Sequence, residues 1–232
     1  VLAALAVLSI TAAGVVLGAD QAHDLPQLES FNPQADSTFT VNSTLDDGDG
    51  DLFDGVCDTG HVHTLQDDDH VHAHTDVRTL RACIEQGNAT STPFQINFSI
   101  SGTGPHTIQP ATLLPGSSAT IDGTTQPGYV GVPLIEIDGA LLSGATGLST
   151  AGTIRGLSIM GFDIGIFLGS NGVVESSYVI LNGTGVLMDG PSGRVGGNAG
   201  TTPGGPCTGT CNLISGNGIG VHVLTGFGDN GG

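Results

Sequence analysis

Histidine and aspartate are concentrated in one short segment, residues 61–76, which reads HVHTLQDDDHVHAHTD. Three of its histidines alternate along the chain, so their imidazoles would point the same way in an extended segment. Imidazole and carboxylate groups are ligands for Zn²⁺, Ni²⁺ and Cu²⁺. The pattern therefore predicts a transition-metal site, with zinc as a cofactor, built from His61, His63, His70, His72, His74, Asp67 and Asp69. The alternative is a solvated, low-complexity insertion that has no specific metal.

A second candidate metal site is the acidic run LDDGDGDLFDGVCD, residues 45–58. Its aspartates fall at positions 1, 3, 5 and 12 of an EF-hand-like loop, where oxygen ligands suit Ca²⁺; they are Asp47, Asp49, Asp51 and Asp58. Leu52 stands at the sixth position, where such a loop needs glycine. The alternative is an acidic turn in water. No pattern predicts an organic cofactor.

Charge excludes several classes of function. The 232 residues carry 22 acidic and 4 basic side chains, a net charge of −18, and all four basic residues are arginines. Nucleic acids and anionic membrane surfaces are recognised through clustered cations, so neither is an expected partner. The absence of lysine also excludes a lysine nucleophile. Fifteen of the acidic residues lie between positions 20 and 85.

The start of the chain predicts export. Residues 1–19 are uncharged and mostly apolar, which is typical of the hydrophobic part of a signal peptide. A membrane anchor is the alternative, and contact with a membrane is then expected only through this segment. Residues 20–37 are polar, contain two prolines and are interpreted as a linker. The remainder is therefore expected to be extracellular or at the cell surface.

Four cysteines in an exported chain favour disulfides, although they allow three pairings. Cys207 and Cys211 share a short loop, GGPCTGTC, and are expected to pair locally, which leaves Cys57 for Cys83. The alternative is that one or more is a buried free thiol. Four matches to the N-glycosylation pattern occur, at Asn42, Asn88, Asn97 and Asn182, a pattern that often arises by chance in such a sequence.

The elements that must position these residues fall into two regions. Residues 38–92 form an acidic, His-rich cap region with a strand at 39–44 and a short helix at 76–86, for which Asp76 is the expected N-cap and Gly87 the C-terminal cap. From residue 93 to 232, short apolar runs bounded by Gly, Asn and Asp recur at a spacing near 20 residues. Ile137 and Ile159 are one such pair.

This periodicity predicts an all-β solenoid in which stacked units bury a ladder of Ile, Val and Leu, with glycines at the corners. Three segments share one Gly-apolar pattern, GIFL at 165–168, GVLM at 185–188 and GVHV at 220–223. A β-sandwich is the structural alternative, because it also has short strands and many turns.

From residue 38 onward the sequence resembles the CSLREA-domain proteins. The resemblance is carried by TFTVNSTLDDGDGDLFDGVCDT, TLRACIEQGNA, SGTGPHTIQP and, most specifically, ATIDGTTQPGYVGVPLIEIDG. It implies a right-handed, single-stranded parallel β-helix of the pectate-lyase-like type, covered by a short N-terminal strand and helix. Because the sequence stops at GDNGG without a closing element, the β-helix is expected to be truncated at its C-terminus. Arg78 stands where the family has a cysteine, so the resemblance leaves open whether the Cys57 bridge is kept.

The resemblance implies location and architecture more than activity. The expected role is structural or adhesive, with polysaccharide or surface glycans as partners and self-association of the rods. One alternative is a polysaccharide lyase or glycoside hydrolase, for which Arg155, Asp163 and Asp138 are weak catalytic candidates. Another is a metal-binding surface protein that uses the His/Asp segment.

Overall fold

The computed structural model describes four segments in full and the backbone of two short strands: residues 38–60, 76–90, 93–197, 209–224, 65–67 and 70–72. The predicted signal segment and linker, residues 1–37, lie outside the described residues. Within the described part the protein is mostly β, with one α-helix and one short 3-10 helix. No helix there is long and apolar enough to cross a membrane.

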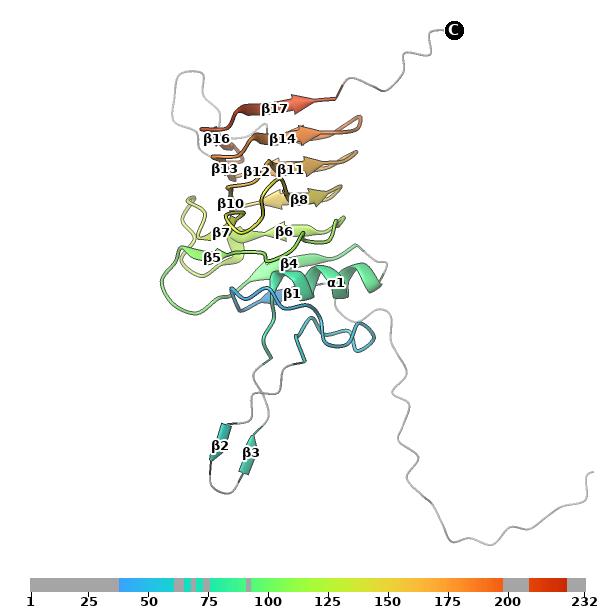
Figure 1. Cartoon of the computed structure of the whole chain (residues 1–232), viewed down its shortest axis with the longest axis vertical. Coiled ribbons are helices and arrows are strands. Elements are labelled where there is room, and N and C mark those ends of the chain that lie inside the picture. The colour runs from blue at the N-terminus through green and yellow to red at the C-terminus, as the bar shows by residue number, and fades with distance from the viewer. Residues whose placement is uncertain are drawn as a thin grey trace, which may run out of the picture. The chain divides into compact units, whose positions relative to one another are not determined.

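Three sheets make up the body of the protein, and all their strand pairs are parallel (Figure 1). The first contains β1 (Thr38–Val41), β4 (Gln95–Phe98), β6 (Thr120–Asp122), β9 (Thr153–Arg155), β12 (Val173–Glu175) and β15 (Arg194–Val195). The second contains β5 (His106–Ile108), β7 (Ile135–Asp138), β10 (Leu157–Met160), β13 (Tyr178–Ile180) and β16 (Leu213–Ser215). The third contains β8 (Thr146–Thr150), β11 (Ile164–Leu168), β14 (Thr184–Met188) and β17 (Ile219–Val223).

The chain visits these sheets in a fixed order, first, second and third, and we call one such passage a circuit. Four complete circuits begin at β6, β9, β12 and β15. Parallel neighbours need a long connection between them, and here the strands of the other two sheets provide it. The β-sandwich alternative is wrong, because its strands would pair mainly antiparallel.

The spacing of apolar residues predicted the register correctly. Ile137 lies opposite Ile159 in the second sheet, and Ile166 lies opposite Val186 in the third. The three Gly-apolar segments are the neighbouring strands β11, β14 and β17. Equivalent residues of successive circuits therefore stack directly, which places like side chains in contact.

The core consists of aliphatic columns, and each column runs from strand to strand within one of the three sheets. Ile121, Ile154 and Val174 form one column, and each is at most 1% exposed. In the columns Ile137–Ile159–Val179 and Leu148–Ile166–Val186, each residue is at most 2% exposed. A single circuit cannot enclose these side chains, so stability depends on stacking.

Left-handed backbone marks the corner between the second and third sheets. The stacked corner residues are Gly161, Leu181 and Gly216, with φ values of 77°, 56° and 68°. Glycine adopts this conformation without steric cost, as predicted for the corners, whereas Leu181 carries a Cβ into it.

The helix α1 (Leu80–Thr90) packs against β1 and β4 (Figure 1). It begins four residues after the predicted N-cap, because Asn42 holds the preceding segment extended: its amide nitrogen donates to the Asp76 carbonyl and its oxygen accepts from the Arg78 N–H. Thr79 is the cap, and its hydroxyl accepts the Ala82 N–H at 3.0 Å.

The predicted C-terminal glycine cap is also wrong, because Gly87 lies inside α1. A Cβ at Gly87 would overlap the ring of Phe94. This glycine therefore permits close packing between the helix and the chain that enters β4.

Candidate functional site

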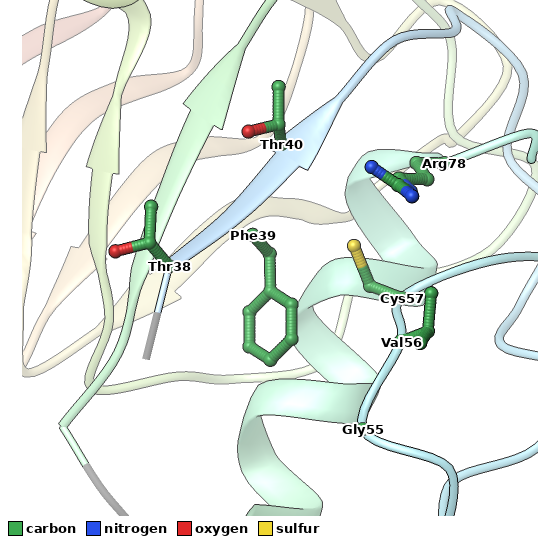
Figure 2. A pocket seen from close by; sticks show the side chains of 7 residues that line it. All are labelled: Thr38, Phe39, Thr40, Gly55, Val56, Cys57 and Arg78. Atoms are coloured by element: carbon green, nitrogen blue, oxygen red, sulfur yellow. The ribbon is translucent and has the colours of Figure 1, made fainter. Parts of the chain in front are cut away.

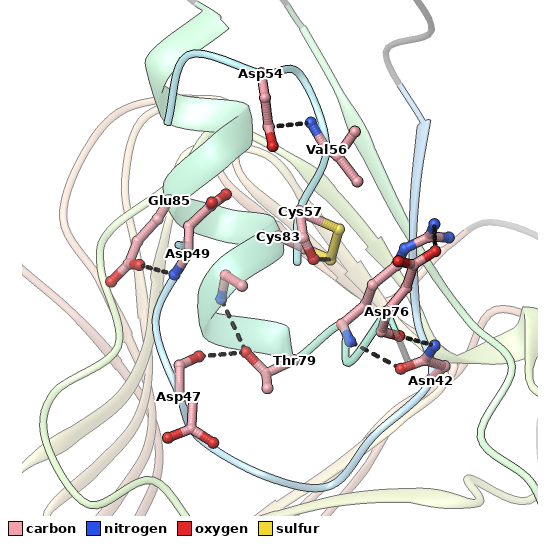
Figure 3. The surroundings of a disulfide bond; sticks show 12 residues. Asn42, Asp47, Asp49, Asp54, Val56, Cys57, Asp76, Thr79, Cys83 and Glu85 are labelled. Carbon is pink, nitrogen blue, oxygen red and sulfur yellow. Dashed lines mark hydrogen bonds and ion pairs between the residues drawn. A yellow bond between two sulfur atoms is a disulfide. The ribbon is translucent and has the colours of Figure 1, made fainter. Parts of the chain in front are cut away.

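The predicted Cys57–Cys83 disulfide is confirmed, and it fastens the acidic loop to α1 (Figure 3). Both cysteines are at most 2% exposed. Cys211 is also disulfide-bonded, while its expected partner, Cys207, lies outside the described residues.

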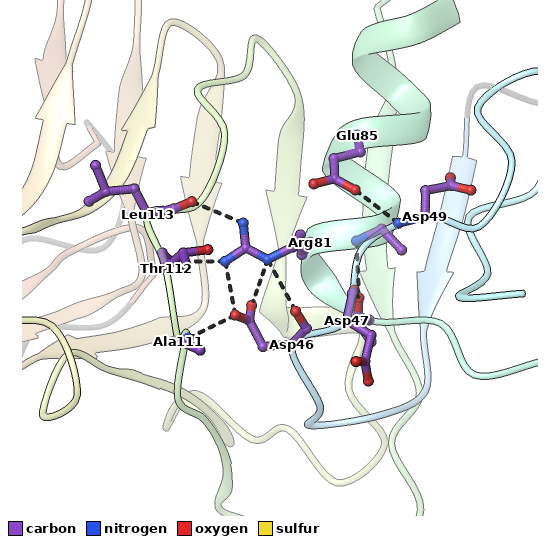
Figure 4. A network of polar contacts seen from close by, with 10 residues as sticks. Asp46, Asp47, Asp49, Arg81, Glu85, Ala111, Thr112 and Leu113 are labelled. Atoms are coloured by element: carbon purple, nitrogen blue, oxygen red, sulfur yellow. Dashed lines mark hydrogen bonds and ion pairs between the residues drawn. The ribbon is translucent and has the colours of Figure 1, made fainter. Parts of the chain in front are cut away.

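Arg81 joins the same helix to the segment between β5 and β6 (Figure 4). Its guanidinium donates to both carboxylate oxygens of Asp46, at 3.1 and 2.9 Å, and to the carbonyl oxygens of Thr112 and Leu113, at 2.8 and 2.9 Å. Asp46 also accepts the Ala111 N–H at 2.8 Å. The side chain of Arg81 is only 10% exposed, so this is a largely buried charge pair whose polar atoms are well satisfied.

The acidic loop does not gather its aspartates into a calcium site. Instead, Asp49, Asp51 and Asp58 each accept the backbone N–H two residues further on, at 2.8–3.0 Å, while the Asp47 carbonyl oxygen accepts the Thr79 hydroxyl. No group of three His, Cys, Asp or Glu residues among those described could hold a metal ion. These carboxylates shape turns, as short acidic side chains commonly do.

Carboxylate crowding still affects one residue of this loop. The pKa of the Asp49 carboxyl is raised to about 6, mainly by burial and less by the charges of Asp54, Asp58 and Glu85, against the opposing hydrogen bond from the Asp51 N–H. The Glu85 carboxylate lies next to Asp49, because its Oε2 accepts the Asp49 N–H at 2.9 Å (Figures 3 and 4).

The predicted transition-metal site lies largely outside the described residues. His61, His63, His74 and Asp69 are among the residues that are not described. The backbone of the other three belongs to an antiparallel hairpin of β2 (Leu65–Asp67) and β3 (His70–His72), in which Asp67 lies opposite His70. Metal binding by this segment stays a prediction.

The three catalytic candidates have different surroundings. Arg155 donates to the buried carboxylate of Asp122, its neighbour across the first sheet, and this contact is the largest cause of the raised Arg155 pKa. Asp138 caps its own turn through the Ala140 N–H at 3.0 Å and accepts the Gln109 amide at 2.9 Å. Asp163 is exposed at a corner, where its backbone oxygen accepts the Thr184 N–H.

All four arginines are engaged in ion pairs within the described part of the chain. Besides the pairs of Arg81 and Arg155, Arg78 lies 3.1 Å from Asp76 and Arg194 lies 3.5 Å from Glu175. An arginine that removes a proton from a substrate must reach that substrate with its guanidinium free. Each guanidinium here is instead directed at a carboxylate of this chain.

Asn182 binds the backbone at a corner between two circuits, a role that was not predicted from the sequence. It is 4% exposed, its oxygen accepts the Phe162 N–H at 3.0 Å, and its amide nitrogen donates to the Ile159 and Ile180 carbonyl oxygens at 3.1 and 3.0 Å. Asn217 occupies the same corner one circuit later and accepts the Asn182 N–H at 2.9 Å. The repeated NGTGV and NGIGV, at 182–186 and 217–221, carried this signal.

Burial also bears on the glycosylation patterns. A glycan on Asn182 would need the amide nitrogen that the fold uses, so this site is inconsistent with the folded structure. Asn42 and Asn88 are exposed, but their amides bind the carbonyl oxygens of Asp76 and Gly116. Asn97 is half-buried and accepts the Gln95 amide at 2.6 Å.

The concave sites formed by described residues include a smaller and a larger one. The smaller, about 220 Å³, lies between β1 and the loop at 55–57, with Phe39 and Arg78 in its lining (Figure 2). The larger, about 530 Å³, is lined by Val130, Gly131, Val132, Ser176, Tyr178, Gly209, Cys211, Asn212 and Leu213, and we call it the Tyr178 groove. Neither lining contains a pair of carboxylates.

Comparison of the chain with protein-family models and with curated proteins gave no match. The functional argument therefore rests on the geometry of the chain itself.

Proposed function

We propose that this protein is an exported, right-handed parallel β-helix with a structural or adhesive role, which presents its sheets to polysaccharides or surface glycans. The repeated passage through three parallel sheets supports the architecture, because each circuit depends on its neighbours for burial. The resemblance to CSLREA-domain proteins supports the same fold. The two cysteines joined at 57 and 83, with a further disulfide at Cys211, support an oxidising location outside the cell.

One observation carries the proposed role: the polar side chains at the corners form hydrogen bonds with backbone groups of this chain. Asp122 accepts the Thr124 N–H at 3.0 Å, Asp138 accepts that of Ala140, and Asn182 and Asn217 bridge successive circuits. An enzyme keeps its acid and base available to a substrate, commonly in a cleft. Residues used in this way stiffen a scaffold instead.

The test is an assay of the purified protein on a panel of neutral and uronate polysaccharides, with Ca²⁺ present. Retention of the protein by at least one insoluble polysaccharide, without the release of reducing ends or unsaturated products, is the expected result. Product formation that is abolished in Arg155→Ala or Asp163→Ala would instead establish a lyase or hydrolase. Leu141→Ala, an exposed change in a loop, is the matched control for handling.

A further inference from the structure

The Tyr178 groove lies on the outer face of the second sheet. Val179 points into the core and is 0% exposed, so its neighbour Tyr178 in β13 faces outward. Leu213 lies directly opposite Tyr178 in β16 and extends the same surface. The loop between η1 (Gly123–Thr125) and β7 supplies one wall, with Val130 88% exposed and Val132 50% exposed.

The opposite wall is held in place by its own hydrogen bonds. The Ser176 hydroxyl donates to the Gly209 carbonyl oxygen at 3.3 Å. The Asn212 amide donates to the Val174 carbonyl oxygen at 2.8 Å, while its oxygen accepts the Ser177 N–H at 3.0 Å. A wall that is organised before binding loses little conformational entropy when a ligand enters.

Charge restricts the ligand that this groove can hold. Among the described residues that line it, there is no Asp, Glu, Lys, Arg or His. In the second sheet, Glu136 lies two strands from Tyr178 at the same register and, within the described part of the chain, is bonded only by the Thr107 hydroxyl, so the nearest charge in this row is negative. In the first sheet, Asp122 is paired with Arg155 and Glu175 with Arg194. An anionic ligand would find no cation here and would approach a chain of net charge −18, so a neutral ligand is favoured.

The surface chemistry is that of a site for a molecule with both apolar and hydroxyl-bearing faces. Tyr178 and its aliphatic neighbours offer a flat apolar floor. The Tyr178 hydroxyl makes no hydrogen bond within the described part of the chain, so it is available to a ligand hydroxyl there. The groove volume of about 530 Å³ lies within the range of ligand pockets, about 300–1,000 Å³.

We propose that the Tyr178 groove is a binding site for a neutral saccharide, whose C–H face packs on the Tyr178 ring while its hydroxyls meet the phenol and the backbone of the walls. This inference rests on the proposed function and adds the ligand class and the place where it binds. It assigns Tyr178 as the principal contact residue.

The protein offers a built-in probe of this groove. It contains no tryptophan and two tyrosines, Tyr129 and Tyr178. Burial, then the charge of Asp122 and the proximity of Tyr178, raise the pKa of the Tyr129 phenol, so both tyrosines belong to one neighbourhood. Tyrosine emission therefore reports ligand entry locally, and Tyr129→Phe leaves Tyr178 as the sole emitter.

The experiment titrates Tyr129→Phe with tetrasaccharides of glucose, mannose and xylose, and with tetragalacturonate as the charged counterpart. A saturable emission change with at least one neutral tetrasaccharide, and none with the uronate, is expected. Calorimetry on the otherwise unchanged chain should show binding at least about tenfold weaker in Tyr178→Leu, which keeps the floor apolar, and unchanged in Leu141→Ala.

Three outcomes would overturn the inference: no saturable change with any neutral sugar, equal binding of the uronate, or full affinity in Tyr178→Leu. The last outcome separates the two proposals. If Tyr178→Leu is still retained on the polysaccharide panel, the protein binds glycans elsewhere, so the groove assignment fails while the proposed function stands. Product release in that panel would refute the proposed function instead.

Discussion

Asn182 provides the sharpest test of how the circuits are held together. Asn182→Ala removes a side chain that is 4% exposed and that satisfies the Phe162 N–H and the Ile159 and Ile180 carbonyl oxygens. A buried polar group left without a partner costs about 1–3 kcal/mol, and the N–H is harder to satisfy by other means than the carbonyls. If the Phe162 N–H and one of the two carbonyl oxygens stay unpaired while the other finds a new partner, the free energy of unfolding should fall by about 2–4 kcal/mol.

Urea unfolding followed by circular dichroism measures this change, with the midpoint moving and the slope unchanged. Asn88→Ala is the control, because Asn88 is exposed and donates one hydrogen bond, to the Gly116 carbonyl oxygen. It should cost at most about 1 kcal/mol. Hydrogen exchange at the Phe162 amide should accelerate only in the Asn182 variant. If Asn182→Ala stays within about 0.5 kcal/mol of the unchanged chain, the corner asparagine does not stabilise the stack as argued.

Three further predictions concern strain, pH and metal. Leu181→Gly should raise the thermal midpoint, because a leucine at φ 56° costs about 1 kcal/mol, whereas Leu181→Ala keeps the Cβ and should bring no gain. The folded-state pKa of Asp49, about 6, lies above its unfolded value of 3.8, so the folded state binds the extra proton and stability should fall as pH rises from 4 to 6. Because Asp49 is only partly buried, solvent screens its charge and this loss should stay below about 1 kcal/mol. Asp49→Asn should remove the loss in matched unfolding curves at pH 4 and 6. Calorimetry should detect Zn²⁺ binding that is lost in the triple variant His70→Ala/His72→Ala/His74→Ala; equal heats in the two proteins would exclude this site.

Much of the strand register could be predicted because it follows from local repetition. Ile137 and Ile159 sit in similar short apolar runs, and parallel stacking of equivalent units leaves one register that buries both. The Cys57–Cys83 bond could also be predicted once the other two cysteines were assigned to one loop. These features depend on patterns that are complete within a few residues or that repeat along the chain.

The errors occurred where a distant residue determined a local conformation. Asp76 has the right type and place for an N-cap, yet Asn42 binds residues 76–78 and delays the helix to Leu80. Gly87 resembles the residue that ends a helix. It lies inside α1 instead, because the ring of Phe94 packs where a Cβ on residue 87 would be. Local propensity cannot register either contact, because both partners come from other elements.

The sequence by itself determined the β-rich class of this protein, its circuit spacing and its acidic N-terminal region, and it favoured one disulfide pairing among the three possible. Only the tertiary structure decided what each polar group does. Stacking at a fixed strand separation places Asp122 beside Arg155 and Asn182 beside Asn217, and it brings Val130, Tyr178 and Leu213 to one groove. The physical reason is that apolar periodicity depends on residues that are close in the sequence. Hydrogen bonds and ion pairs depend instead on segments far apart in the sequence that folding brings within about 3 Å of one another.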